Sequence, residues 1–174
     1  MMIRDLHEND LGDMIGTVYS DVLGYEIEVM YDKDISQEYV EKNIEYFNHL
    51  DQEFLEEICA ALKRFFDDYY EMNPDLCDHI SDELIENYEQ NPMSILNYID
   101  IGIYFFAKCS AENEDIPVID ISGDCEWDGD AQVTIKAKDN RLVYVGPFSD
   151  IRIWNEEAIM AHEWYNYAVP ENDN

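Results

Sequence analysis

The chain has 174 residues, of which 47% are hydrophobic and 13% aromatic, enough for one well-packed core and few for two independent ones. It contains ten Lys and Arg and 41 Asp and Glu, a formal net charge of -31 at pH 7. A field of this sign repels nucleic-acid phosphates and anionic membranes. We therefore expect one domain over residues 1–174 that binds neither nucleic acid nor membrane directly.

The N-terminal part of the sequence predicts a β-hairpin followed by helices. Residues 16–31 are rich in Thr, Val, Tyr and Ile and are interrupted at Gly24, the pattern of two short strands joined by a turn. Ser36 and Asp51 each precede an apolar repeat of three and four residues, where their side chains can cap the first turn of a helix. In the helix after Asp51 the apolar residues that recur at these spacings are Leu55, Ile58, Leu62, Phe65, Phe66 and Tyr69.

The middle of the chain predicts a block of helices over about residues 36–99. A third helix is expected at about residues 81–88, and a short helical turn follows Pro92 and reaches Tyr98. Residues 36–100 contain seventeen acidic and three basic residues, a net of -14. The solvent-exposed face of this block is therefore expected to be almost entirely carboxylate.

After residue 100 the sequence changes to β-branched and aromatic residues. Residues 101–107 are continuously apolar, which is typical of a strand covered on both faces. Residues 119–127 and 132–138 alternate between apolar and polar, and a three-residue turn at residues 128–130 would keep both apolar sets on one face. This register pairs Cys125 with Val133, Ser122 with Lys136, and Asp120 with Lys138.

A second hairpin continues this meander. Asp139 and Asn140 both tolerate positive φ and predict a two-residue turn. That turn pairs Ala137 with Leu142, and Ile135 with Tyr144. A last strand is expected at residues 151–154, so that the meander covers about residues 101–154.

The C-terminal part predicts a helix and a tail. Asn155 is placed to cap a helix over about residues 155–167, and residues 170–174 are expected to form a disordered polar tail. Together the elements predict an α+β fold, in which an antiparallel sheet, made of the N-terminal hairpin and the C-terminal meander, packs against acidic helices.

Targeting signals and cysteines point to one compartment. The first 13 residues carry charges where a signal peptide has an apolar centre. The four cysteines include no Cys-x-x-Cys pair, so we expect free, mostly buried thiols. These features predict a cytoplasmic protein without a membrane span.

The sequence contains little that could carry chemistry. The acids from Asp124 to Asp130 resemble the start of a calcium loop, with Gly129 sixth, but Ile135 occupies the twelfth position, where a bidentate Glu is required. No His has a His or Cys partner at helical spacing, and no nucleophile elbow or phosphate-binding glycine loop is present. We expect no metal, no cofactor and no catalysis; an enzyme or calcium-dependent module at this cluster is the rival hypothesis.

Two C-terminal segments carry a family resemblance. Residues 119–128, which end in Cys125-x-Trp127-Asp128, and residues 142–148, which contain Val145-Gly146, resemble a group of small acidic bacterial proteins of uncharacterised function that are immunity-protein-like. Members carry Glu-His-Gly after the tryptophan, where this chain has Gly-Asp-Ala. The resemblance implies an immunity protein, which binds and neutralises a toxin in the cell that makes it.

The charge favours the same hypothesis independently, because an acidic face can occlude the basic substrate groove of a nuclease-like toxin. We expect a basic protein partner that contacts exposed acids and a tyrosine of the helical block. The candidate contact residues are Glu53, Glu56, Glu57, Asp67, Asp68, Tyr70 and Glu71. The alternatives are a phage-type nucleic-acid mimic that inhibits a DNA-handling or defence protein, and an acidic domain without inhibitory role.

Overall fold

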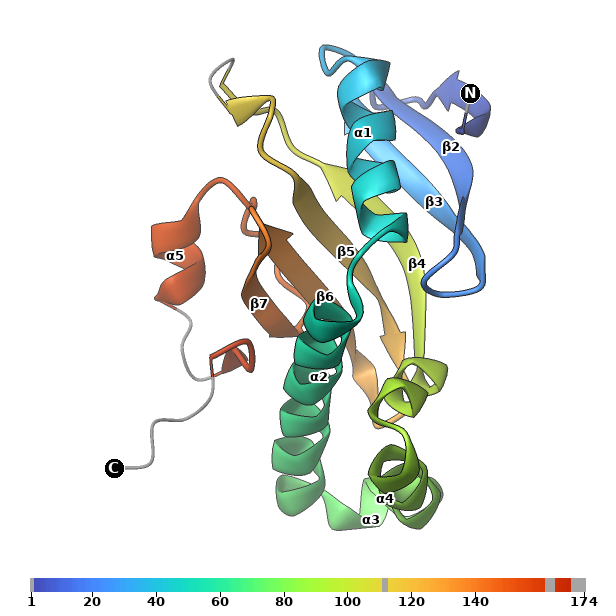
Figure 1. Cartoon of the computed structure of the whole chain (residues 1–174), viewed down its shortest axis with the longest axis vertical. Helices are drawn as coiled ribbons and strands as arrows, with labels where there is room; N and C mark the ends of the chain where they lie inside the picture. The colour runs from blue at the N-terminus through green and yellow to red at the C-terminus, as the bar shows by residue number, and fades with distance from the viewer. Residues whose placement is uncertain (1, 111–112, 162–164, 170–174) are drawn as a thin grey trace.

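The computed structural model describes residues 2–110, 113–161 and 165–169. Within this part of the chain the strands form one seven-stranded sheet, in the order β1-β2-β3-β4-β5-β6-β7. The strands are β1 (Arg4–Glu8), β2 (Asp13–Ser20), β3 (Tyr25–Asp32), β4 (Ile99–Phe106), β5 (Val118–Cys125), β6 (Asp128–Lys138) and β7 (Arg141–Pro147). The helices are α1 (Gln37–Asn48), α2 (Gln52–Met72), α3 (Pro74–Cys77), α4 (Ser81–Gln90), the 3-10 helix η1 (Pro92–Tyr98) and α5 (Glu156–Met160). Figure 1 shows α1 and α2 across one face of the sheet, with α3 and α4 together at one end of the molecule.

Neighbouring strands are antiparallel except for β3 and β4, which are parallel. Parallel neighbours need a crossover connection, and the helices from α1 to η1 supply it. The α+β class is thereby confirmed, with an N-terminal hairpin, a block of acidic helices against the sheet and a C-terminal meander. The parallel pair is not predicted, because the direction in which a long crossover returns leaves no local pattern in the sequence.

Side-chain caps fix the starts of the two main helices. The Ser36 hydroxyl accepts the backbone N–H of Tyr39 at 3.2 Å, and an Asp51 carboxylate oxygen accepts that of Phe54 at 2.8 Å. Each bond satisfies an N–H that lacks a partner within its helix. Both predicted helix starts are confirmed.

The hairpin and the later helical elements are confirmed as well. β2 and β3 pair through their whole length, and Gly24 in the turn has a φ of 82°, a left-handed value that glycine adopts without strain. The third helix is α4 and the short turn is η1. β1 and α3 are not predicted, because β1 has a mostly exposed polar sequence and α3 is a single turn after Pro74.

The register between β5 and β6 differs from the prediction. The chain reverses at Glu126 and Trp127, so that Cys125 pairs with Asp128. The reversal occurs early because the Trp127 side chain is buried, 1% exposed, with its ring edge-on to two phenylalanines of α2. The three-residue turn is therefore wrong and the pairs shift by two residues: Asp120 lies opposite Lys136, Ser122 opposite Thr134, and Gly123 opposite Val133.

The second hairpin is confirmed at its turn. Asp139 and Asn140 have φ values of 54° and 56°, and Ala137 pairs with Leu142. Beyond this point β7 contains one extra residue, a bulge. Ile135 consequently pairs with Val145, and its predicted pairing with Tyr144 is wrong.

The last predicted strand, at residues 151–154, is wrong. Residues 148–154, here called the covering segment, form no strand and cross the sheet face that the helices leave open. The backbone N–H of Ser149 donates to the Thr134 hydroxyl at 3.3 Å, and the Trp154 indole N–H donates to the carbonyl oxygen of the residue after β4 at 3.2 Å. Neither bond pairs the covering segment with the β7 edge, so these residues add no strand to the sheet.

The C-terminal helix is shorter than predicted. Asn155 caps it as expected, by accepting the backbone N–H of Ala158, but α5 ends at Met160. The part of the prediction at residues 162–164, and the tail at 170–174, lie outside the described residues. Beyond α5 the chain follows the β7 edge instead, where the N–H of Tyr167 donates to Val145 at 2.7 Å and the Asn166 side chain bonds the β7 backbone.

The two faces of the sheet are covered unequally. Tyr104 packs edge-on against Phe47 of α1 and is fully buried, whereas its neighbours Ile103 and Phe105 point the other way and are only half-buried. The expectation that this strand is covered on both faces is therefore wrong, because the covering segment reaches only part of the open face. None of the helices in the described residues is long and apolar enough to cross a membrane.

Candidate functional site

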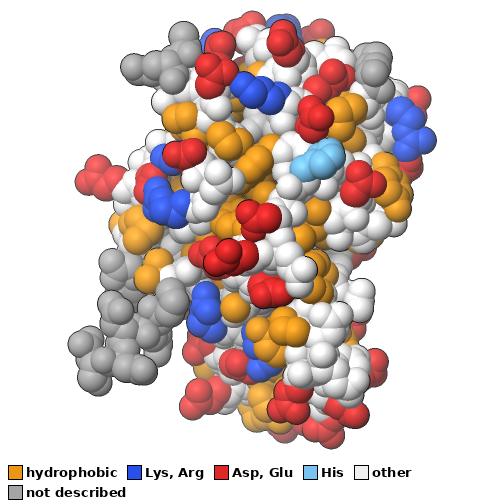
Figure 2. All heavy atoms as spheres, viewed as in Figure 1, with side chains coloured by type: hydrophobic (Ala, Val, Ile, Leu, Met, Phe, Trp, Pro, Cys, Tyr) orange, Lys and Arg blue, Asp and Glu red, His pale blue; other side chains and the backbone are white. Residues whose placement is uncertain are grey.

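One end of the molecule carries far more acidic than basic side chains. Residues 65–107 contain ten Asp and Glu and no Lys or Arg. Figure 2 shows acidic side chains around the lower end of the molecule, over α3 and α4. We call this surface the acidic end, and its members are exposed: Asp67, Glu71, Asp75, Asp78, Asp82, Glu83, Glu86 and Glu89.

Two apolar side chains lie exposed within the acidic end. Met72, the last residue of α2, and Leu76 in α3 are each 60% exposed. Their chain neighbours include Glu71 and Asp75, so apolar surface is set among carboxylates. This combination of an apolar centre and a charged rim is found where proteins bind other proteins.

Most of the predicted contact residues have exposed side chains. Successive residues of an α-helix are turned by about 100°, so five of the seven candidates share one side of α2 and all five are exposed: Glu53, Glu56, Glu57, Asp67 and Glu71. Lys63 and Arg64 lie between them in the sequence. The Lys63 ammonium is 2.5 Å from the Asp67 carboxylate. These two basic residues thus divide the five exposed acids into one group at residues 53–57 and another at residues 67–71.

The other two candidates serve packing. The Tyr167 hydroxyl donates to the Asp68 carboxylate, and the Tyr70 ring stacks on Phe66 with centroids 5.7 Å apart. Both residues are half-buried. A substitution at Asp68 or Tyr70 would therefore perturb folding as well as any contact with a partner.

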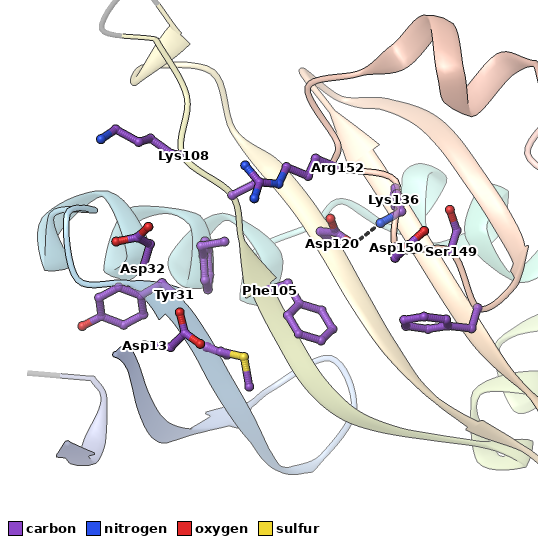
Figure 3. A pocket seen from close by; sticks show the side chains of 14 residues that line it. Asp13, Tyr31, Asp32, Phe105, Lys108, Asp120, Lys136, Ser149, Asp150 and Arg152 are labelled. Carbon is purple, nitrogen blue, oxygen red and sulfur yellow. Dashed lines mark hydrogen bonds and ion pairs between the residues drawn. The ribbon is translucent and has the colours of Figure 1, made fainter. Parts of the chain in front are cut away.

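A second surface is a cavity of about 310 Å³, here called the sheet cavity, on the face opposite α1 and α2 (Figure 3). Its apolar lining includes Met30, Phe105 and Phe148. Its polar and charged lining is Asp13, Asp32, Lys108, Asp120, Lys136, Ser149, Asp150 and Arg152. The covering segment supplies one wall of the sheet cavity and β3 and β4 supply the other.

An ion pair is buried beside the sheet cavity. The observed register sets Asp120 opposite Lys136, with ammonium and carboxylate 2.6 Å apart and side chains only 7% and 3% exposed. The covering segment shields the pair from water. Burying two charges costs desolvation free energy, which the attraction between ammonium and carboxylate must offset. Burial raises the pKa of Asp120 to about 6, although the Lys136 ammonium lowers it in part.

We expect Asp120 to titrate near pH 6 in the folded protein. Because this pKa lies above the ordinary value of 3.8, the folded state binds the proton more tightly than the unfolded chain. The contribution of this carboxyl to the free energy of unfolding therefore falls as pH rises from 3.8 to about 6. A pH titration followed by carboxyl-carbon NMR measures this pKa, and the resonance of Asp120 is identified by its absence from the Asp120→Asn variant. A titration midpoint near pH 4 would contradict the expected pKa.

Buried thiols and the acids of the calcium-like cluster are the remaining candidates for chemistry among the residues described. Burial raises the pKa of both Cys59 and Cys125 to about 12, so these thiols stay protonated at neutral pH. Of the acids in the calcium-like cluster, Asp124 and Glu126 are exposed and Asp128 is buried. No group of three or more His, Cys, Asp or Glu able to hold a metal occurs in the described part of the chain.

Sequence reasoning missed both the exposed apolar pair and the sheet cavity. The lack of Lys and Arg over residues 65–107 could have been read from the sequence and would have moved the candidates toward α3 and α4. Arg152 had no comparable signal. Arg152 falls within the strand predicted at residues 151–154, and only the path of the covering segment brings it to the sheet cavity.

Comparison with known proteins gives a match to a family model. No curated protein and no solved structure matches the chain significantly. Residues 3–152 match the model of a family described as a domain of unknown function, a span of 150 of the 174 residues that includes every strand and α1 to α4. The chain therefore belongs to this family, DUF6985.

Proposed function

We propose that the chain is an acidic protein-binding domain of the bacterial cytoplasm, which binds a basic protein through its acidic end. The observation that carries the proposal is the run from residue 65 to 107, with ten acids and no base, eight of the acids being the exposed members of the acidic end. A surface of one sign speeds the encounter with a partner of the opposite sign, and salt weakens the effect.

The exposed Met72 and Leu76 supply the second requirement of an interface. Charge complementarity chiefly sets encounter rate and specificity, whereas affinity comes mainly from desolvated side chains near the centre of the contact. Two side chains that are each 60% exposed offer such a centre. The partner is expected to place an apolar side chain on them and Lys or Arg around it.

The finer form of the proposal is an immunity protein that neutralises a basic, nuclease-like toxin by occluding its active face. Binding rather than catalysis is favoured by the protonated thiols of Cys59 and Cys125 and by the exposure to solvent of every member of the acidic end. Inhibition then needs only stoichiometric contact. The partner-binding residues proposed first, on α2, contribute through Asp67 and Glu71, which belong to the acidic end.

The test begins with capture from native lysate on the immobilised chain, followed by measurement of the dissociation constant for the protein recovered. We expect one basic protein, released by salt. A variant with Asp82→Asn, Glu83→Gln, Glu86→Gln and Glu89→Gln should bind it about ten-fold more weakly or worse, because rim charges of one sign act together. If the partner is a nuclease, an equimolar amount of the chain should abolish its activity.

The matched control removes four exposed acids elsewhere, with Asp10→Asn, Asp21→Asn, Glu38→Gln and Glu45→Gln. Equal weakening by both variants would show that only total charge matters and would defeat the assignment to the acidic end. Recovery of no salt-released partner would contradict the proposal as a whole. Capture of a nucleic-acid-handling protein would instead favour the mimic hypothesis.

A further inference from the structure

The basic residues of the chain are almost all paired. Nine of the ten Lys and Arg have a partner among the described residues, eight with carboxylates and Arg64 with the Tyr167 carbonyl. Arg152 is the tenth. It is exposed, lines the sheet cavity, and has no ion-pair or hydrogen-bond partner within the described part of the chain. In a chain with 41 acids, an uncompensated guanidinium at a cavity is unusual.

The position of Arg152 suits a ligand rather than bulk solvent. Figure 3 shows its side chain extending from the covering segment over the sheet cavity, toward the strand that carries Phe105. In the same covering segment Phe148 is 51% exposed, so it presents aromatic surface that a ligand could cover. The volume of about 310 Å³ lies at the small end of the range for ligand sites, about 300 to 1,000 Å³.

The charges around the sheet cavity select the class of ligand. Asp120 and Lys136 neutralise each other, and the Lys108 ammonium is 3.6 Å from the Asp34 carboxylate, which leaves Arg152 as the main group for an anion. A planar guanidinium binds a carboxylate through two parallel hydrogen bonds. The nearby carboxylates Asp13, Asp32 and Asp150 repel any anion, and they repel a doubly charged phosphate about twice as strongly as a singly charged carboxylate, so phosphate is the more disfavoured of the two.

We propose that the sheet cavity binds a small monocarboxylate with an apolar body about the size of a phenyl ring. Arg152 binds the carboxylate, and Phe105, Met30 and Phe148 contact the body. This site lies on the other face of the sheet from the helices that build the acidic end, so ligand binding and partner binding use separate surfaces.

Calorimetric titration of the full chain with 3-phenylpropionate tests the proposal. We expect saturable binding at one site, weakened about ten-fold or more by Arg152→Gln, since a charge-assisted pair is lost. Arg4→Gln, which removes an exposed guanidinium on β1 outside the sheet cavity, should bind like the unmodified protein. Amide NMR should locate the shifts at Phe105, Phe148 and Ser149.

Two further probes test separately whether the negative charge and the aromatic ring of the ligand are required. 2-Phenylethylamine has the same ring with the opposite charge, and inorganic phosphate has the anion without the ring; neither should compete with 3-phenylpropionate. Absence of 3-phenylpropionate binding, equal binding by Arg152→Gln, or tighter binding of the amine or of phosphate would each overturn the proposal. Because Arg152 is exposed, its variant is expected to fold, and far-ultraviolet circular dichroism checks this.

Discussion

Replacing Asp120 with Asn is expected to lower the free energy of unfolding at pH 7 by about 1 to 2 kcal/mol, because with a folded-state pKa of about 6 the neutral carboxyl lies only about 1.4 kcal/mol above the ionised one at this pH. The substitution keeps the shape of the side chain and removes its charge, so the Lys136 ammonium stays buried, 3% exposed, without a counter-ion. Lys136→Met should cost a similar amount at pH 7 and less at lower pH, because burial already raises the pKa of Asp120 to about 6 and the carboxyl can take up a proton.

The double variant Asp120→Leu with Lys136→Met should recover most of the loss. Once both charges are removed, no desolvation penalty remains, and apolar replacements of such pairs are within about 1 kcal/mol of the original or more stable. Urea unfolding of all three variants measures the coupling between the two side chains. Additive losses in the double variant would contradict this account.

Ser122→Ala removes a hydroxyl that lies 2.8 Å from the Thr134 hydroxyl oxygen. Loss of this hydrogen bond should lower the free energy of unfolding by about 1 kcal/mol.

Gly123→Ala is expected to destabilise the protein by about 3 kcal/mol or more, because overpacking here meets backbone rather than a movable side chain. A Cβ on Gly123 would lie 2.0 Å from the carbonyl oxygen of Asp100 and 2.5 Å from the Cα of Ile101. Both atoms belong to β4, so β4 and β5 would have to separate at the point where their register already shifts.

The matched control is Gly102→Ala on the neighbouring strand. Nothing lies within 4 Å of a Cβ at that position, and Ala restricts the unfolded chain more than Gly does. We therefore expect a change of less than about 1 kcal/mol, in the stabilising direction. Thermal unfolding followed by circular dichroism compares the two variants. Equal stability of the two would show that the sheet relaxes at Gly123 without cost.

Local chemistry made much of the fold predictable. Ser36 and Asp51 begin helices because a short polar side chain can take an N–H that the helix itself leaves unpaired. The turn at Asp139 and Asn140 follows from the tolerance of these residues for positive φ. Each of these signals acts within a few residues, and each was confirmed.

The errors came from contacts between distant residues. Trp127 packs against Phe65 of α2, and the chain therefore reverses earlier than predicted. The alternation of residues 119–138 contains no sign of this contact. Arg152 and Phe148 reach the sheet cavity only because the covering segment folds back over the sheet. The predicted contact residues lie along α2 because they were chosen by charge density alone, although the sequence itself shows Lys63 and Arg64 between them.

The parallel pairing of β3 with β4 also constrains the order in which the chain can fold. The hairpin β2–β3 and the meander β4–β7 close short loops, whereas the β3–β4 pair must wait for the whole helical crossover. Until then, two strand edges stand open, and such edges are templates for pairing between molecules. A net charge of -31 then keeps identical nascent chains apart during the interval in which each could pair with another copy. The charge would thus protect folding as well as select a partner.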